Sequence, residues 1–322
     1  MRVLINGFGR IGRSVLRAWA QGGWPEVEIV GINDIAAPEM CAYLFEFDSV
    51  FGPWKGRVAL AEGSLVLDGR PLALTRAPDL SVLDLAGVDL VMECTGRADS
   101  PEVAGRGLVA GAGRVLVSGP SRAAGVTVVL GANEATLGTH RIVSNASCTT
   151  NALAPLVKVL HREFGIVTGS MTTVHCYTGS QPTVDAPAAD FARSRAAALS
   201  MVPTTTSAQR LLDLVLPEIA GRIEGSAVRV PVASVSAVDL CVMTERRATA
   251  EAVNGVLAQA GGVIGTTGKA LVSTDLRARG ESVVMALPET RVTKDGLVRV
   301  FGWYDNEWGF SNRMLDVARL MA

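Results

Sequence analysis

Long apolar runs, an excess of one charge and paired cysteines are all missing from this 322-residue sequence. No apolar run could span a bilayer, and Met1 leads directly into a strand-like segment, so neither a membrane anchor nor a leader is expected. The 30 basic and 31 acidic residues balance, which argues against a nucleic-acid partner. The five cysteines show no disulfide or metal-ligand pattern, so no metal is expected. We expect a cytoplasmic α/β protein.

Five short apolar runs alternate with helix-like stretches in the first half of the chain, which is typical of a parallel sheet covered by helices. The runs that predict strands are Val3–Asn6, Glu28–Asn33, Asp89–Cys94, Arg114–Ser118 and Arg141–Asn145. Each run ends in small or polar residues, and the carboxyl ends of parallel strands meet where such sheets bind ligands. Because the chain exceeds the usual size of one core, a second domain is expected.

A glycine-rich turn follows the first run and precedes a plausible helix. It consists of Gly7, Phe8, Gly9, Arg10, Ile11 and Gly12. Gly7 would permit the tight turn, Gly9 the approach of a pyrophosphate, and Gly12 close packing of the helix on the strand. Asp34 ends the next strand, where its carboxylate can bind ribose hydroxyls and repel a 2′-phosphate. The pattern favours NAD over NADP, and a purely structural turn is the alternative.

Cys148 lies between the fifth run and the helix-like segment that starts at Ala152. A helix N-terminus is expected to lower the pKa of this thiol, and the thiolate is the reactive form. His175 lies near the end of a strand predicted over Gly169–Tyr177 and could meet Cys148 in space. A buried structural thiol and a core histidine are the alternatives. Cys176 alternates to the opposite strand face and is interpreted as packing.

The segment from Thr178 to Pro203 has no periodicity, and irregular stretches of this length are usually functional or disordered. Arg195 lies within it, with a solvated basic loop as the alternative to a ligand contact. Thr206 and Ser207 stand at the entry of a predicted helix, which is either an anion site or an ordinary N-cap. Arg229 lies among apolar neighbours in a strand-like segment, where a buried guanidinium needs an anionic partner. A substrate phosphate is one candidate.

Four motifs together resemble the phosphorylating glyceraldehyde-3-phosphate dehydrogenase family, nearly end to end and in the family's order. They are INGFGRIGR, SNASCTTN, MTTVH and YDNEWGFSNR. The resemblance implies a Rossmann-type NAD-binding domain, residues 1–147 plus 309–322, and a second α/β catalytic domain, residues 148–308. It also implies a homotetramer and a terminal helix that returns to the first domain.

The resemblance also implies roles for single residues. Cys148 matches the nucleophile and His175 the base. The positions that match NAD contacts are Gly7, Phe8, Gly9, Arg10, Ile11, Gly12, Asp34, Thr95, Ser118 and Asn306. Those that match contacts to the substrate phosphate are Thr178 and Arg229, and those that match the site of the attacking phosphate are Ser147, Thr149 and Thr206. Arg195 and Ser207 are further candidates for phosphate contacts, from their positions in the irregular segment and at the helix entry.

The implied reaction oxidises a small phosphorylated aldehyde, glyceraldehyde 3-phosphate, to an acyl phosphate through a thioester on Cys148. Several departures from the family pattern, among them Ser207 in place of glycine, leave erythrose 4-phosphate as substrate or another oxyanion such as arsenate as alternatives. The run from His175 to Gln181 favours the triose. A catalytically silent NAD-binding regulatory protein is the alternative from another class.

Overall fold

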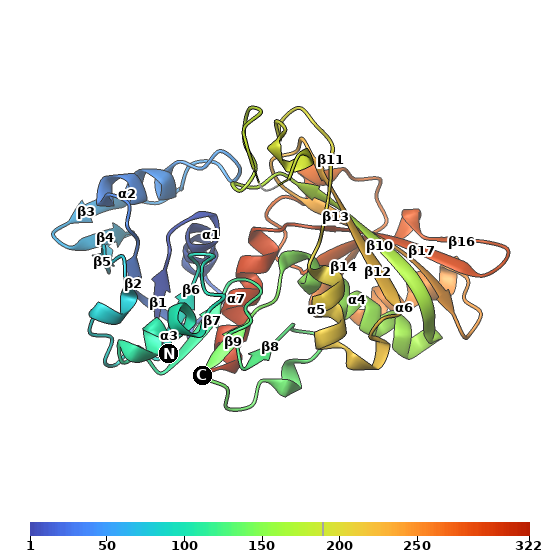
Figure 1. Ribbon diagram of the computed structural model, residues 1–322, viewed down its shortest axis with the longest axis horizontal. Coiled ribbons are helices and arrows are strands. Elements are labelled where there is room, and N and C mark those ends of the chain that lie inside the picture. Colours follow the sequence, from blue (N-terminus) through green and yellow to red (C-terminus); the bar gives the residue numbers. More distant parts are fainter. Residues whose placement is uncertain (189) are drawn as a thin grey trace. The chain divides into compact units, whose positions relative to one another are not determined.

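The computed structural model describes residues 1–188 and 190–322, which form two compact units. Unit 1 comprises Met1–Val128, Glu134–Ala146 and Ser311–Ala322, and unit 2 comprises Val129–Asn133 and Ser147–Phe310. No helix within the described residues is long and apolar enough to cross a membrane. Figure 1 follows the chain through both units by colour.

Unit 1 is built on a nine-stranded sheet in the order β3-β4-β5-β2-β1-β6-β7-β9-β8. The strands are β1 (Arg2–Asn6), β2 (Glu28–Asn33), β3 (Val58–Ala61), β4 (Ser64–Leu67), β5 (Arg70–Thr75), β6 (Leu90–Glu93), β7 (Arg114–Val117), β8 (Val126–Thr127) and β9 (Ile142–Ser144). The six strands β5-β2-β1-β6-β7-β9 are parallel. Numbered by their sequence in the chain, they lie side by side in the Rossmann order 3-2-1-4-5-6. The strand order therefore reverses between β1 and β6.

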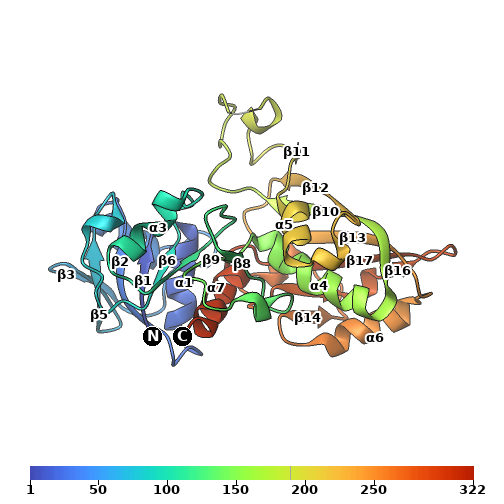
Figure 2. The ribbon, with the colours of Figure 1, turned by 60° about the horizontal axis from the view of Figure 1, so that its bottom comes forward.

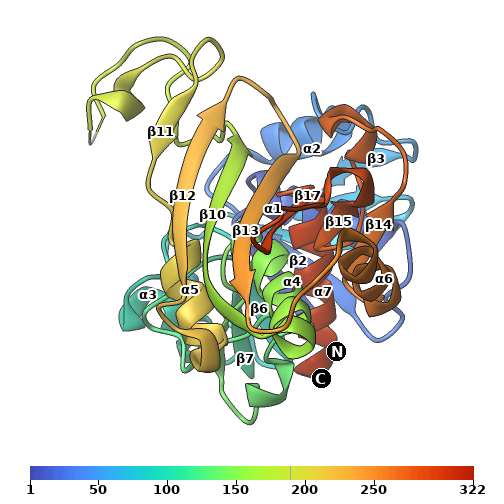
Figure 3. The same ribbon diagram turned by 90° about the vertical axis from the view of Figure 1, so that its right-hand side faces the viewer.

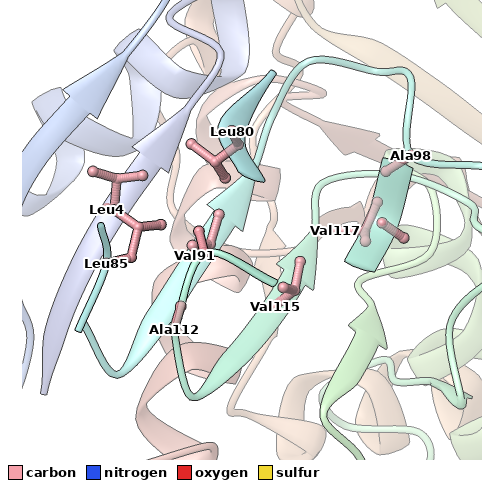
Figure 4. Close-up of a cluster of buried hydrophobic side chains, with 10 residues drawn as sticks. Leu4, Leu80, Leu85, Val91, Ala98, Ala112, Val115 and Val117 are labelled. Atoms are coloured by element: carbon pink, nitrogen blue, oxygen red, sulfur yellow. The ribbon is translucent and has the colours of Figure 1, made fainter. Parts of the chain in front are cut away.

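Helices cover both faces of this sheet. They are α1 (Arg10–Ala20), α2 (Pro38–Glu46), α3 (Pro101–Val109) and most of α7 (Trp308–Leu320). On one face, a methyl group at Gly12 of α1 would lie 3.1 Å from the Ile5 side chain. On the other, a methyl group at Gly107 of α3 would lie 3.0 Å from Val91. Leu4 and Val91 belong to the buried cluster on this second face (Figure 4). The side chains of Leu4 and Ile5 thus point to opposite faces of β1, each covered by a helix, as in a doubly wound sheet.

Unit 2 contains a second sheet in the order β11-β12-β10-β13-β17-β15-β14, and β16 also pairs with β17. Figure 3 shows the broad strands β12, β10 and β13 side by side. The strands are β10 (Ile166–Cys176), β11 (Val202–Thr204), β12 (Ile223–Val230), β13 (Ser236–Thr244), β14 (Ile264–Thr267), β15 (Val283–Ala286), β16 (Arg291–Val292) and β17 (Leu297–Tyr304). The helices are α4 (Cys148–Phe164), α5 (Ala208–Val215) and α6 (Ala250–Ala260).

The two faces of this second sheet differ in burial. In β13, Val238, Leu240 and Val242 are fully buried, whereas the alternate residues Asp239 and Cys241 are only partly buried. In β17 the partly exposed positions carry large side chains, namely Leu297, Arg299, Phe301 and Trp303. The helices α4, α5 and α6 therefore cover one face. The other face is open within the described chain except around Trp303, which packs against the buried cluster of Val235, Leu276 and Val284.

Most predicted elements lie where the sequence places them. The strand over Glu28–Asn33 has the predicted bounds. The main difference is α4, which begins at Cys148, four residues before the predicted start at Ala152. Short elements without a clear period, such as α2, α3 and the β3-β4-β5 meander, are not distinguished by the apolar pattern.

Candidate active site

Unit 1 contains a cavity of about 330 Å³ at the point where the strand order reverses. Its walls come from the ends of β1, β2 and β6 and from the start of α3. They include Asn6, Gly7, Gly9, Asn33, Asp34, Ile35, Ala77, Pro78, Leu80, Glu93, Cys94, Thr95, Arg97, Val103 and Arg106. Open α/β sheets bind their ligands at this position, outside the carboxyl ends of the strands.

The glycine-rich turn fits a dinucleotide. Gly7 adopts a φ of +92°, and a methyl group there would lie 2.7 Å from the Thr95 backbone nitrogen. A methyl group at Gly12 would lie 2.1 Å from the Gly7 carbonyl oxygen, so any side chain there would push α1 off the turn. The space beside Gly9 is empty to 4 Å, and no side chain caps the N-terminus of α1. A helix N-terminus without a side-chain cap, beside open space, is suited to a phosphate group.

Two carboxylates shape this cavity. Asp34 accepts hydrogen bonds from the backbone nitrogens of Phe8 (2.6 Å) and Ala36 (2.8 Å), which fixes its position at the end of β2. Glu93 is buried at the end of β6, where it accepts hydrogen bonds from Asn6 Nδ2 (2.5 Å) and from the backbone nitrogen and hydroxyl of Thr95. Glu93 therefore holds Thr95, a predicted cofactor contact, in place.

The other predicted cofactor residues of unit 1 contribute in different ways. The Phe8 side chain is buried and stacks on Phe45, so only its backbone is available. Arg10 forms an ion pair with Asp48, which occupies its guanidinium. The Ser118 backbone nitrogen donates to the Glu93 carbonyl oxygen at 2.9 Å, which aligns the ends of β6 and β7.

In unit 2, Cys148 and His175 are neighbours, as the sequence predicts. The Cys148 Sγ lies 3.5 Å from His175 Nε2. Cys148 is the first residue of α4, and Ser147 caps this helix by accepting a hydrogen bond from the Thr150 backbone nitrogen at 3.1 Å. His175 lies near the end of β10 on its buried face. The thiol can therefore transfer its proton directly to the imidazole.

The backbone before the thiol is strained. Ala146, two residues before Cys148, adopts a φ of +56°, a left-handed conformation that residues other than glycine rarely adopt. Its backbone nitrogen donates to Ser144 Oγ at 3.1 Å. Such strain is often found at functional sites, where the surrounding structure over-determines the backbone.

Burial changes the protonation of both groups. It raises the pKa of the Cys148 thiol, and the nearby Arg229 guanidinium and hydrogen bonds from Thr149 lower this pKa only in part. The expected net lowering of the pKa by the helix terminus is therefore wrong, because desolvation dominates. Burial and the positive charge of Arg229 together lower the pKa of His175 to about 4. The imidazole is neutral at pH 7 and able to accept a proton.

Arg229 lies at the end of β12, directly opposite His175 in the parallel register. Its Nη1 lies 2.7 Å from His175 Nδ1 and donates to the Cys176 carbonyl oxygen at 2.9 Å. Within the described residues, the hydrogen-bond partners of this guanidinium are therefore neutral groups of His175 and Cys176. A half-buried arginine with neutral partners is suited to an anionic ligand.

Tyr304 and Asp305 support the site. The Tyr304 hydroxyl is hydrogen-bonded to Thr149 Oγ1 (2.8 Å) and Thr173 Oγ1 (2.7 Å), which ties α4 to β10. Asp305 accepts hydrogen bonds from the backbone nitrogens of Glu307 and Trp308 and so caps α7. The YDNEWG motif is thus largely a structural element that fixes the position of Asn306.

The remaining predicted phosphate contacts are less closely connected. Arg195 forms an ion pair with Asp185, so its charge is already balanced. The Thr178 hydroxyl is 3.0 Å from Ser180 Oγ. Thr206 Oγ1 accepts a hydrogen bond from the Ala208 backbone nitrogen, and Ser207 is the N-cap residue of α5. Among the described residues, no cluster of His, Cys, Asp and Glu is arranged to hold a metal ion.

Sequence reasoning misses four residues of these sites. Glu93 and Tyr304 are buried polar residues in strands, and that pattern is itself a signal that a partner exists. Cys176 and Ser236 both donate to the Asn306 side chain, although the sequence suggests only packing for Cys176. No local signal could have revealed these contacts, because Asn306 is 130 residues from Cys176 and 70 from Ser236.

A dinucleotide-type sheet in one unit and a cysteine–histidine pair in the other are the features of an α/β oxidoreductase.

Comparisons with known proteins agree with this class. Residues 1–101 match the family model "Glyceraldehyde 3-phosphate dehydrogenase, NAD binding domain", and residues 147–306 match "Glyceraldehyde 3-phosphate dehydrogenase, C-terminal domain". The chain is 47% identical to the glyceraldehyde-3-phosphate dehydrogenase of Cereibacter sphaeroides, over 100% of this chain and 98% of that protein. Those of Xanthobacter flavus and Pseudomonas aeruginosa are each 46% identical, with the same coverage. The chain belongs to the glyceraldehyde 3-phosphate dehydrogenase family.

Proposed function

We propose that this chain oxidises glyceraldehyde 3-phosphate with NAD and inorganic phosphate, and releases an acyl phosphate. The observation that carries the proposal is the Cys148 Sγ, 3.5 Å from His175 Nε2 and beside Arg229, whose hydrogen-bond partners in the described chain are neutral. A nucleophile, a base and a cation that no carboxylate neutralises are the groups that a phosphorylated aldehyde requires.

The reaction begins when the Cys148 sulfur attacks the aldehyde carbon and its proton passes to His175 Nε2. The protonated His175 returns this proton to the alkoxide to give the hemithioacetal, and then takes the hydroxyl proton back as the C–H bond breaks. A nicotinamide held in the site would supply the acceptor for the hydride. Inorganic phosphate attacks the resulting thioester and displaces the Cys148 thiolate, which completes the cycle.

We assign the substrate phosphate to Arg229 and Thr178, and the attacking phosphate to Ser147, Thr149, Thr206 and Ser207. Arg195 would add positive charge nearby if its ion pair with Asp185 opened. Support comes from the helix start at Ser147, because amides at a helix N-terminus attract anions. The Thr149 hydroxyl is fixed by Tyr304 and so presents a defined donor or acceptor.

We assign NAD binding to residues 1–147 plus 309–322 and catalysis to residues 148–308. The glycine-rich turn would hold the pyrophosphate, Asp34 the adenosine ribose, and Asn306 the carboxamide of the nicotinamide. The open space beside Gly9 and the carboxylate of Asp34 at the end of β2 support this assignment.

We further propose a homotetramer. Within its described residues, the segment between β10 and β11 extends from the sheet of unit 2 (Figure 2). It carries large apolar side chains that are exposed. Phe191 is 97% exposed and Leu199 is 84% exposed, which is unusual for a stable isolated subunit. A cytoplasmic location is also proposed, because a catalytic thiol needs reducing conditions.

A substrate panel tests the function. NAD reduction is measured with glyceraldehyde 3-phosphate and erythrose 4-phosphate, in phosphate and in arsenate. We expect preferred turnover of the triose and, without either oxyanion, a burst of at most one NADH per subunit. Cys148→Ser should abolish turnover, and His175→Asn should slow it by about 10²- to 10⁴-fold.

Cys241→Ser is the matched control, because this thiol lies on the open face of β13. Full activity in Cys148→Ser would exclude the thioester route. NAD binding without turnover of any aldehyde would instead identify a silent binding protein.

A further inference from the structure

The Asn306 side chain has a defined orientation. Its Oδ1 accepts hydrogen bonds from Cys176 Sγ at 3.1 Å and from Ser236 Oγ at 3.4 Å. Asn306, Cys176 and Ser236 are all buried. An amide whose oxygen is occupied by two donors presents its Nδ2 hydrogens to a ligand.

The Cys176 thiol is suited to donate in this contact. Sulfur is a weak acceptor, so the opposite orientation of the amide, with Nδ2 facing the sulfur, would waste a good donor. Burial raises the pKa of Cys176 to about 12, so the group stays a protonated thiol. Cys176 thus donates a hydrogen bond to Asn306, in addition to its packing in the core.

Ser236 is held by both of its neighbours. Its Oγ accepts a hydrogen bond from the Cys176 backbone nitrogen at 3.1 Å, which leaves its own hydrogen for Asn306. The preceding residue, Val235, adopts a φ of +66°. This conformation is a true outlier for a β-branched residue, and it must be maintained by the surrounding structure.

We propose that Cys176 and Ser236 are positioning residues that fix the Asn306 amide with Nδ2 directed at the cofactor's carboxamide oxygen. This inference rests on the proposed role of Asn306. The thiol and the hydroxyl act through Asn306 and touch no reacting atom.

A thermodynamic cycle on NAD affinity separates positioning from general structure. The dissociation constant of NAD is measured by titration calorimetry for Cys176→Ala and Ser236→Ala, each alone and combined with Asn306→Ala. In the wild-type background each change should weaken NAD binding about 2- to 10-fold, the effect of one lost neutral hydrogen bond. In the Asn306→Ala background the same changes should alter affinity less than twofold.

Two conservative variants sharpen the test. Cys176→Ser keeps a donor and should bind NAD within twofold of wild type. Cys241→Ala, which removes a thiol from the open face of the sheet, is the matched control and should leave affinity unchanged.

Equal losses in both backgrounds, or no loss in the wild-type background, would overturn the inference. Unchanged NAD affinity in Asn306→Ala alone would show that Asn306 does not contact the cofactor. The proposed function is tested separately, by turnover of the triose in the wild-type protein. If Cys176→Ala fails to fold, the S–H stretching region of the infrared spectrum tests the contact instead. The wild-type spectrum should contain a band from a strongly hydrogen-bonded thiol, and Cys176→Ser should remove this band. A wild-type spectrum without the band would refute the contact.

Discussion

The two contacts of the His175 Nδ1 atom compete. A base that accepts a proton at Nε2 must carry its hydrogen on Nδ1, and that hydrogen would go to the Cys176 carbonyl oxygen at 2.7 Å. Arg229 Nη1 lies at the same distance from Nδ1, but an arginine can only donate. Only one of the two can be a hydrogen bond at a time. Withdrawal of Arg229 toward a phosphate therefore favours the tautomer that catalysis needs.

Replacement of Arg229 should change the titration of both neighbours in the same direction. Its positive charge lowers the pKa of Cys148 and that of His175, so Arg229→Leu should raise both. We expect the pH midpoint for alkylation of Cys148 by iodoacetamide to rise by about one unit.

Arg210→Leu, on the exposed side of α5, serves as the control and should leave the midpoint unchanged. A midpoint that falls, or that does not move, in Arg229→Leu would show that this guanidinium does not act on the thiol.

Single residues of the site are predictable where the chemistry is local. Cys148 and His175 are named from the sequence because each stands beside a recognisable strand or helix end. The pKa of Cys148 is not predictable from the sequence, because the balance of burial against the helix terminus depends on side chains from other elements. The ion pair of Arg195 with Asp185 also depends on a loop path that has no period in the sequence.

At the scale of elements, the start of α1 offers a matched pair of substitutions. Gly12→Ala places a methyl group 2.1 Å from the Gly7 carbonyl oxygen, so both thermal stability and NAD affinity should fall. Gly9→Ala meets no protein atom within 4 Å and has a φ of −71° that alanine accepts. It should therefore change the free energy of unfolding by less than about 1 kcal/mol.

The two variants should differ most in calorimetry. Gly9→Ala should lose more than tenfold in NAD affinity, because its methyl group occupies the space reserved for the pyrophosphate. Wild-type affinity in a folded Gly9→Ala protein would place the pyrophosphate elsewhere.

Long elements with a clear period are predicted well, and the reason is burial on one face. In β10, predicted over Gly169–Tyr177, the alternation of buried Met171, Thr173 and His175 with partly exposed Thr172 and Val174 follows the strand period. The early start of α4 at Cys148 is not visible in the apolar pattern, since Thr149, Thr150 and Asn151 are polar. Their burial is compensated by hydrogen bonds such as that between Thr149 and Tyr304.

At the scale of the whole molecule, the exposed apolar side chains of the loop between β10 and β11 allow the proposed tetramer to be tested. We expect the protein to sediment as a tetramer. Phe191→Asp combined with Leu199→Asp should shift it toward smaller species, because charges would be buried without partners. Val109→Asp, at a residue of α3 that is 75% exposed, is the control and should leave assembly intact.

Circular dichroism must show that the double variant is folded. A variant that stays tetrameric would mean that this loop does not form the subunit interface.

Unit 1 is assembled from segments that are synthesised far apart in time. The segment Ser311–Ala322 belongs to unit 1, where Met314, Leu315 and Val317 are fully buried and Arg114 Nη1 donates to the Met321 carbonyl oxygen at 2.8 Å. On the ribosome, the first 128 residues emerge long before these last twelve. The nucleotide-binding part therefore keeps an apolar surface uncovered until residues 311–322 have been made, by which point every residue of the part bearing Cys148 has been synthesised.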